Sequence, residues 1–333
     1  MSDGRRGVAA VTGIVLRVAL GVLVAALLLG VAARFYVNPP GHGAARAVNG
    51  AASPDALRRH VEFLCASPRS HRDVAHLDEL ADYIARELER AGGRVTRQPY
   101  AAEGTTYQNV VARLGPETGD VVVIGAHYDA FGPLPGADDN ASGVAVLLEA
   151  ARLLRGAELG CRVEAVAYTL EEPPYFGGPG MGSAVHAASL DAAAASVRGA
   201  LTLEMLGYFS DRQPWPATLG WLWLVYPRHG HFVALVGRPQ DRALARTVKG
   251  AANGAGSVPF HAYVGPRLAV GDLSDHRNYW ERGFPALMLT DTAFVRNPNY
   301  HTPHDTPETL DYERMAQVAR AVASAVATLA APR

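Results

Sequence analysis

The longest apolar stretch of the chain lies near its N-terminus. Between Val8 and Ala33 the only charged residue is Arg17. A membrane-spanning helix needs about 20 apolar residues, so this stretch can cross a bilayer if Arg17 extends to the headgroups. Two further Arg residues precede it, and basic residues favour the cytoplasmic side. We expect residues 1–35 to form a cytoplasmic tip and a signal anchor with the rest extracytoplasmic; signal-peptide cleavage after residues 31–33 is the alternative.

The remaining pattern alternates between helix and strand. Pro and Gly interrupt both periods in residues 36–53, which we interpret as a linker before a domain of residues 54–333. Apolar positions spaced by three and four predict helices that begin at 53–55 and include 77–88, 144–154, 242–252 and 312–329. Short apolar runs predict strands at 110–111, 121–124, 163–168, 201–206 and 285–289. This alternation predicts an α/β fold of three αβα layers: a mixed, mostly parallel central sheet with helices on both faces, preceded by the N-terminal membrane helix.

The composition excludes several classes of protein. With 49% hydrophobic and 19% charged residues, the chain is too apolar to be disordered. Its 31 Lys and Arg are balanced by 32 Asp and Glu, which argues against a protein that binds nucleic acid through phosphate contacts. Two cysteines cannot build a cysteine zinc site, so any metal must be held by His and carboxylates. Whether Cys65 and Cys161 pair outside the cytoplasm stays open.

Polar residues cluster where the predicted strands end. His127 follows one strand, Glu171 and Glu172 follow the next, and Glu204 lies at the end of a third. Ligands bind at the carboxyl ends of strands in such sheets. The late loop 297–305 adds two imidazoles. Imidazole and carboxylate without thiolate are the ligands of hydrolytic zinc, so these positions predict a zinc site.

The ordered segments carry a family resemblance. GAHYDA, PGADDNASGVAVLLEAARLL, TLEE, LTLEMLGY, SDHRNYWERGFPALMLTDTA and NYHTPHDT resemble the co-catalytic zinc aminopeptidases of metallopeptidase family twenty-eight, of the bacterial leucyl aminopeptidase or aminopeptidase Y type. Relatives of that family include glutamate carboxypeptidases and glutaminyl cyclases. The resemblance extends over roughly residues 55–330.

Site residues follow from this resemblance position by position. It implies two zinc ions, one bound by His127, Asp138 and Glu204 and the other by Asp138, Glu172 and His301. Asp138 would bridge the ions, because two close dications need an anion between them. The resemblance further implies that Glu171 is the general base, that Asp129 orients His127, and that Tyr300 contacts the developing oxyanion. His304 is an alternative ligand to His301.

The resemblance implies an aminopeptidase that hydrolyses N-terminal peptide bonds through a metal-bridging water, with Glu171 as the base and peptide or protein N-termini as substrates. The N-terminal apolar run adds an extracytoplasmic location and the lipid bilayer as a partner, and the balanced charge argues against nucleic acid. A glutaminyl cyclase-like acyltransferase and a non-catalytic binding ectodomain are the alternatives. Glu204 stands where many members of the family carry Asp, which could alter metal occupancy. The segment 173–180 is rich in Pro and Gly and could reshape the pocket.

Overall fold

An eight-stranded mixed sheet forms the centre of the domain, in the order β1-β2-β4-β3-β5-β8-β6-β7. The computed structural model describes residues 2–193, 195–265 and 271–332. The strands are β1 (Arg94–Ala102), β2 (Thr105–Leu114), β3 (Val121–His127), β4 (Arg162–Tyr168), β5 (Val197–Glu204), β6 (Val233–Val236), β7 (Phe260–Tyr263) and β8 (Ala286–Thr290). The pairs β3–β4, β3–β5, β5–β8 and β6–β7 are parallel, whereas β1–β2, β2–β4 and β6–β8 are antiparallel.

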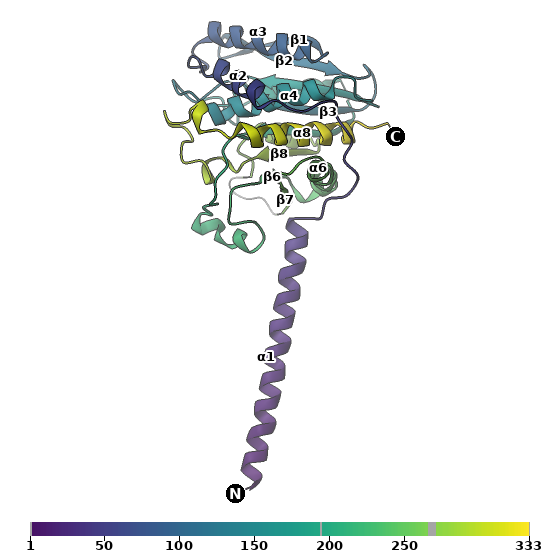
Figure 1. Cartoon of the computed structure of the whole chain (residues 1–333), viewed down its shortest axis with the longest axis vertical. Helices are drawn as coiled ribbons and strands as arrows, with labels where there is room; N and C mark the ends of the chain where they lie inside the picture. Colours follow the sequence, from purple (N-terminus) through teal and green to yellow (C-terminus); the bar gives the residue numbers. More distant parts are fainter. Residues whose placement is uncertain (1, 194, 266–270, 333) are drawn as a thin grey trace.

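Helices cover both faces of this sheet. On β3, Val122 and Ile124 face one core and Val121 and Val123 face the other, because successive side chains of a strand alternate. The larger core packs against α2 (Pro54–Leu64), α3 (Val74–Arg90), α4 (Gly143–Leu154), α6 (Arg242–Ala255) and α8 (Tyr312–Leu329). The smaller core packs against α5 (Gly182–Ala192) and α7 (His276–Glu281). Figure 1 shows α3, α4, α8 and α6 following one another across the larger face. The predicted three-layer α/β fold is confirmed.

Most predicted elements are present, with differences at their ends. The predicted strand 201–206 lies at 197–204, because Met205 has a left-handed φ of 51° that ends the extended backbone. Strands β1, β6 and β7 were not predicted from the sequence. β1 is a largely polar edge strand, and β6 and β7 have only four residues each, which is too short for a clear strand period. Cys65 and Cys161 do not form a disulfide.

The N-terminal helix α1 (Ser2–Val37) projects away from the domain (Figure 1). Its segment Arg17–Val37 has 21 residues and a mean hydropathy of 2.3, which is long and apolar enough to cross a membrane. A signal sequence passes the same test. Among residues 18–36 every side chain is exposed, whereas Val37 is buried in the domain.

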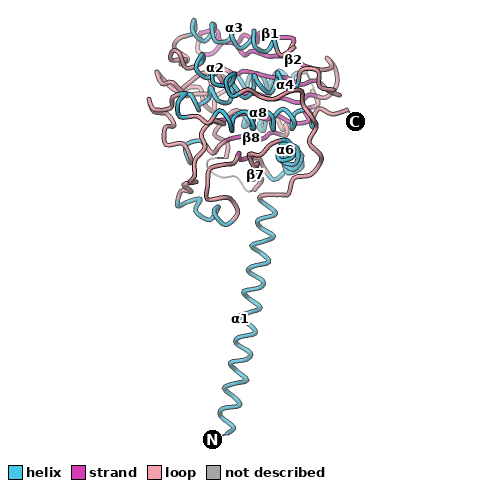
Figure 2. The backbone as a smooth tube through the Cα atoms, viewed as in Figure 1, coloured by secondary structure: helices cyan, strands magenta, loops and turns pink. Residues whose placement is uncertain are grey.

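The segment that the sequence analysis interprets as a linker lies against the domain. The His42 N–H donates to Arg246 O on α6 at 3.0 Å, and the Asn49 N–H donates to Leu153 O on α4 at 3.2 Å. Figure 2 shows the loop that leaves α1 and passes beside α6. These contacts hold the segment against α6 and α4.

Candidate metal centre

Three neighbouring parallel strands deliver the candidate ligands to one edge of the sheet. His127 is the last residue of β3 and Glu204 is the last residue of β5. Glu171 and Glu172 follow β4 directly after Leu170, whose left-handed φ of 61° turns the chain. Because parallel strands end at the same edge, these side chains converge. All four side chains are buried.

Two groups of potential metal ligands share one aspartate. His127, Asp139 and Glu204 form one group, and Asp139, Glu172 and His301 form the other; within each group the ligand atoms lie within 4.8 Å of one another. His127 Nε2 is 3.5 Å from Asp139 Oδ1 and 3.4 Å from Glu204 Oε2. His301 Nε2 is 3.0 Å from Asp139 Oδ2 and 3.4 Å from Glu172 Oε2. Each oxygen of Asp139 therefore faces a different imidazole.

Asp138, which the resemblance implies as the bridge, belongs to neither group, and its carboxylate faces elsewhere. Asp138 Oδ1 accepts the Gly207 N–H and Oδ2 accepts the side-chain amide of Asn297, both at 2.8 Å. Both aspartates lie in the irregular segment η1 (Ala137–Ser142), where the backbone is non-helical at Asp139. The turn of the backbone sends the two side chains to different places, and sequence spacing alone cannot separate two adjacent aspartates.

The residues fit a metal ion. Among the described residues, His127 Nε2, His301 Nε2 and Glu172 Oε1 are buried without a hydrogen-bond partner. Burial, then the charge of Asp139, raises the pKa of Glu172 to about 7. Burial also raises the pKa of Glu171, reinforced by Glu204 and Glu172 and opposed by His127. Buried carboxylates in such a cluster need compensating cations, and this oxygen and nitrogen donor set suits zinc.

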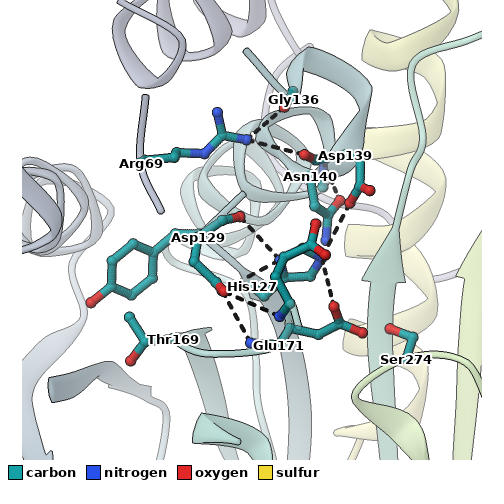
Figure 3. A network of polar contacts seen from close by, with 12 residues as sticks. Arg69, His127, Asp129, Gly136, Asp139, Asn140, Thr169, Glu171 and Ser274 are labelled. Carbon is teal, nitrogen blue, oxygen red and sulfur yellow. Dashed lines mark hydrogen bonds and ion pairs between the residues drawn. The ribbon is translucent and has the colours of Figure 1, made fainter. Parts of the chain in front are cut away.

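Asp129 connects His127 to the glutamate pair. His127 Nδ1 lies 3.2 Å from the main-chain oxygen of Asp129 and 3.6 Å from its Oδ1. The two carboxylate oxygens of Asp129 accept the N–H groups of Glu171 and Glu172, each at 3.2 Å (Figure 3). A group that fixes a ligand imidazole from behind sets its orientation and tautomer. Asp129 thus holds both His127 and the backbone of the glutamates.

Three further residues hold parts of this cluster in place and are not among the predicted site residues. Arg69 is fully buried and donates to the main-chain oxygens of Pro135, Gly136 (2.5 Å) and Asp139 (3.3 Å), as Figure 3 shows in part. The Asp305 carboxylate accepts the N–H groups of Asp138 at 2.9 Å and Asp139 at 3.1 Å. Ser274 Oγ donates to Glu204 Oε2 at 2.7 Å. Ser274 and Asp305 lie in quoted segments, but no pattern in the sequence marks Arg69.

His301 lies among aromatic rings. Its ring stacks on Phe131 with centroids 4.1 Å apart and on Tyr300 with centroids 3.8 Å apart. Burial raises the pKa of the Tyr300 phenol, so this hydroxyl stays protonated and can donate a hydrogen bond. His304, the alternative ligand, is exposed and belongs to neither ligand group. Of the two imidazoles in this loop, His301 is the one that meets Asp139.

An apolar cavity of about 110 Å³ adjoins the first ligand group. Glu204 and Tyr300 line the end nearest the ligands. The other walls are mostly apolar and come from β6, β7, β8 and the short helices η2 (Ala217–Leu224) and η4 (Ala293–Val295); they include Leu222, Tyr226, Phe232, Tyr263, Met288 and Phe294. The cavity has room for one large apolar side chain, since a single water needs only about 10–15 Å³ by this measure.

The sequence profile described as "Peptidase family M28" matches residues 109–326. The chain belongs to peptidase family M28. Its relatives include "Uncharacterized protein YfbL" of Escherichia coli strain K12, which is 44% identical over 283 residues, 80% of this chain and 85% of that protein. "Probable leucine aminopeptidase" of Trichophyton verrucosum is 25% identical over 274 residues, 79% of this chain and 68% of that protein.

Solved structures agree with this M28 assignment. The aminopeptidase from Aneurinibacillus sp. strain AM-1 superposes with a TM-score of 0.64 at 17% identity, over 85% of this chain and 95% of that one. A glutaminyl cyclase from Fimbriiglobus ruber gives a TM-score of 0.62 at 19% identity, over 87% and 98%. A Zn-dependent exopeptidase from Parabacteroides distasonis gives 0.64 at 22% identity, over 83% and 98%. At these identities the likeness shows the M28 fold, and membership of the family supports a hydrolase.

Proposed function

We propose that this M28 protein is a zinc-dependent aminopeptidase that removes the amino-terminal residue of peptides. The observation that carries the proposal is the pair of ligand groups that share Asp139 beside a further carboxylate, Glu171. Glu171 Oε2 lies 3.9 Å from His127 Nε2 and belongs to neither group. Similarity to a probable leucine aminopeptidase supports the same activity.

Two ions fit the ligand arrangement. His127, Asp139 and Glu204 would hold one zinc, and Asp139, Glu172 and His301 would hold the other. Bound zinc would lower the pKa of a coordinated water and polarise the scissile carbonyl. Glu204 Oε2 lies 3.4 Å from His127 Nε2 and accepts a hydrogen bond from Ser274 Oγ. In this proposal a glutamate therefore acts as a ligand where many family members carry Asp.

Glu171 is the proton carrier in this proposal. Asp129 fixes its main-chain N–H, which points the side chain toward His127. The carboxylate takes a proton from the attacking water and delivers it to the leaving amine, the role of a positioned general base that becomes a general acid. Its burial excludes bulk water that would otherwise compete for that proton. In this proposal Tyr300 donates its phenolic hydrogen to the developing oxyanion.

The apolar cavity gives the proposed substrate preference. Glu204 and Tyr300 line it together with residues of β6 and β7, and its volume of about 110 Å³ suits one side chain rather than an extended peptide. The wall is formed by aromatic and aliphatic residues, which favours amino-terminal Leu, Met or Phe over Asp or Lys. The adjacent carboxylates favour a cationic amine at the same position.

A panel of aminoacyl chromogenic amides tests this proposal. We expect Leu, Met and Phe amides to be hydrolysed faster than Asp and Lys amides, and N-acetyl-Leu amide to be resistant because its amine is blocked. Dialysis against a chelator should abolish hydrolysis and added zinc should restore it. Hydrolysis of the acetylated amide at the rate of the free one, or unchanged activity after complete metal removal, would contradict an aminopeptidase.

A glutaminyl cyclase is the second candidate. The observation in its favour is the fold likeness to the Fimbriiglobus ruber glutaminyl cyclase, which covers 98% of that chain. A cyclase converts an amino-terminal Gln to pyroglutamate with loss of ammonia and leaves the peptide bond intact. The presence of both ligand groups favours the peptidase.

We further propose that α1 anchors the chain in the membrane with the M28 domain outside the cytoplasm. The support is the exposed apolar segment Arg17–Val37 and the basic residues that precede it. A reporter active only outside the cytoplasm, fused after residue 50, should be active in a membrane fraction. An inactive, well-expressed fusion would reverse the orientation, and a soluble fragment that begins near Arg34 would indicate cleavage.

A further inference from the structure

The end of α1 is built into the domain. Val37 is buried beside Leu222, Tyr226 and Tyr263. The main-chain oxygen of Val37 accepts the Val264 N–H at 2.9 Å. The following Asn38 side chain accepts the Ala262 N–H at 3.0 Å and the Lys249 ammonium at 2.6 Å. The end of α1 is therefore fixed to the domain. The domain surface next to this junction has a fixed position along the axis of α1.

Two adjacent exposed apolar residues, Trp223 and Leu224, lie beside the last turn of α1. Arg34, in the last turn of α1, donates to the main-chain oxygen of Leu224 at 3.4 Å. Trp223 is 47% exposed and Leu224 is 59% exposed. Among the side chains that the structure describes outside α1, they are the only adjacent pair of exposed large apolar residues. In Figure 1 their helix η2 is the short teal-green helix at the end of the domain from which α1 leaves.

Basic and aromatic side chains surround the pair. The Arg228 guanidinium lies 4.4 Å from the Trp223 ring centroid. Arg242 lies 5.6 Å from the Tyr36 ring centroid and donates to the main-chain oxygen of Phe35 at 2.9 Å. The stretches 18–54 and 212–228 contain no Asp or Glu. Aromatic and arginine side chains without acidic ones are the composition of surfaces that lie at the lipid headgroups.

We infer that η2 is a second membrane contact, with Trp223 and Leu224 inserted among the lipid headgroups beside the point where α1 leaves the bilayer. This inference rests on the proposed span of α1. Leu222 of the same short helix packs against Val37 and also lines the apolar cavity. The membrane contact therefore holds one wall of the cavity at the membrane surface. The protein would then favour the amino termini of peptides that are associated with that surface.

Quenching of tryptophan fluorescence in phosphatidylcholine vesicles tests the contact. Full-length protein is reconstituted with lipids that carry bromine near the headgroup end of the acyl chains. We expect Trp223→Phe to remove a large part of the quenched fluorescence. Trp280→Phe should leave it unchanged, because the Trp280 indole donates to Ala286 O within the domain. Equal quenching in the parent and Trp223→Phe, in protein that floats with the vesicles, would overturn the contact while leaving the anchor. Protein that does not float with the vesicles would overturn both.

Kinetics separate a membrane contact from a structural role. The double variant Trp223→Ser, Leu224→Ser changes two residues outside the cavity lining. We expect its KM to rise several-fold for a peptide that carries a C-terminal acyl chain in the same vesicles. Its kcat and KM for a soluble chromogenic amide should stay at the parent values. An equal rise in KM for both substrates would overturn the inferred membrane role.

Discussion

The carboxylates of Asp138 and Asp139 turn to different sides of the loop that carries them. Asp139 faces the imidazoles of His127 and His301 at 3.5 and 3.0 Å. Asp138 faces Gly207 and Asn297, at 2.8 Å from each donor. Asp139 therefore contacts the other candidate metal ligands, whereas Asp138 connects the loop to the residues after β5 and to the late loop.

The two aspartates should respond differently to the same substitution. We expect Asp139→Asn to lower metal content in both groups, since it removes the shared ligand charge. Asp138→Asn should retain metal and instead lose about 1–3 kcal/mol of stability, because a buried charged acceptor is weakened. Metal equivalents per chain by mass spectrometry and thermal unfolding of both variants check this. Metal loss in Asp138→Asn with full occupancy in Asp139→Asn would exchange the two roles.

Substitutions of Glu171 and Glu172 should affect different properties, the first turnover and the second metal binding. Glu171→Gln keeps the shape and removes the basicity, so kcat should fall roughly 10²–10⁴-fold while metal content stays at the parent level. Glu172→Gln should lose metal because its carboxylate belongs to the His301 group. Steady-state kinetics and metal analysis on the same preparations provide the measurement. Parent-like kcat in Glu171→Gln would disprove its role as the base.

Metal removal should destabilise the protein in a pH-dependent way. Without metal, burial and Asp139 raise the pKa of Glu172 from 4.5 to about 7, so the folded chain retains a proton that the unfolded chain releases. The folded state then loses stability as pH rises from about 4.5 through about 7. We expect the Tm of the chelated protein to fall over this range, and Glu172→Gln to fall less. A pH-independent Tm after chelation would contradict this coupling.

A buried ion-pair network outside the metal site should govern acid stability. Glu164 meets His186 Nε2 at 3.0 Å and Arg113 Nε at 3.0 Å. Burial alone would raise the pKa of Glu164, but His186 and Arg113 lower it to about 2. A depressed carboxyl pKa stabilises the fold above its ordinary value of 4.5, and this stability is lost as pH falls through about 2.

We expect Glu164→Gln to lower stability at neutral pH by about 1–3 kcal/mol and to approach the parent as pH falls toward 2. Glu117→Gln is the matched control, since Glu117 is largely exposed in its pair with Arg94 and should contribute little. Chemical unfolding across pH provides the comparison. A Glu164→Gln deficit that persists unchanged at low pH would show that the loss comes from packing rather than charge.

Much of the fold could be predicted from the sequence, because the central strands and the long helices have strong periodic patterns. The sequence-based prediction placed His127, Glu172 and Glu204 at strand ends, and the structure brings all three into the ligand groups. It named Asp138 as the shared ligand, whereas the structure places Asp139 in both groups, because the directions of the two side chains depend on backbone angles inside η1. Arg69 joins the site through main-chain oxygens far along the chain, and such contacts leave no local signal in the sequence.

Product analysis tests the central claim most directly. Two peptides that are identical except for an amino-terminal Leu or Gln are incubated with the zinc-loaded protein and followed by mass spectrometry. The account predicts that the Leu peptide loses its first residue as a free amino acid, and that Glu171→Gln prevents this loss without removing zinc. Loss of ammonia from the Gln peptide with an intact Leu peptide, or no reaction of either by fully zinc-loaded protein, would contradict it.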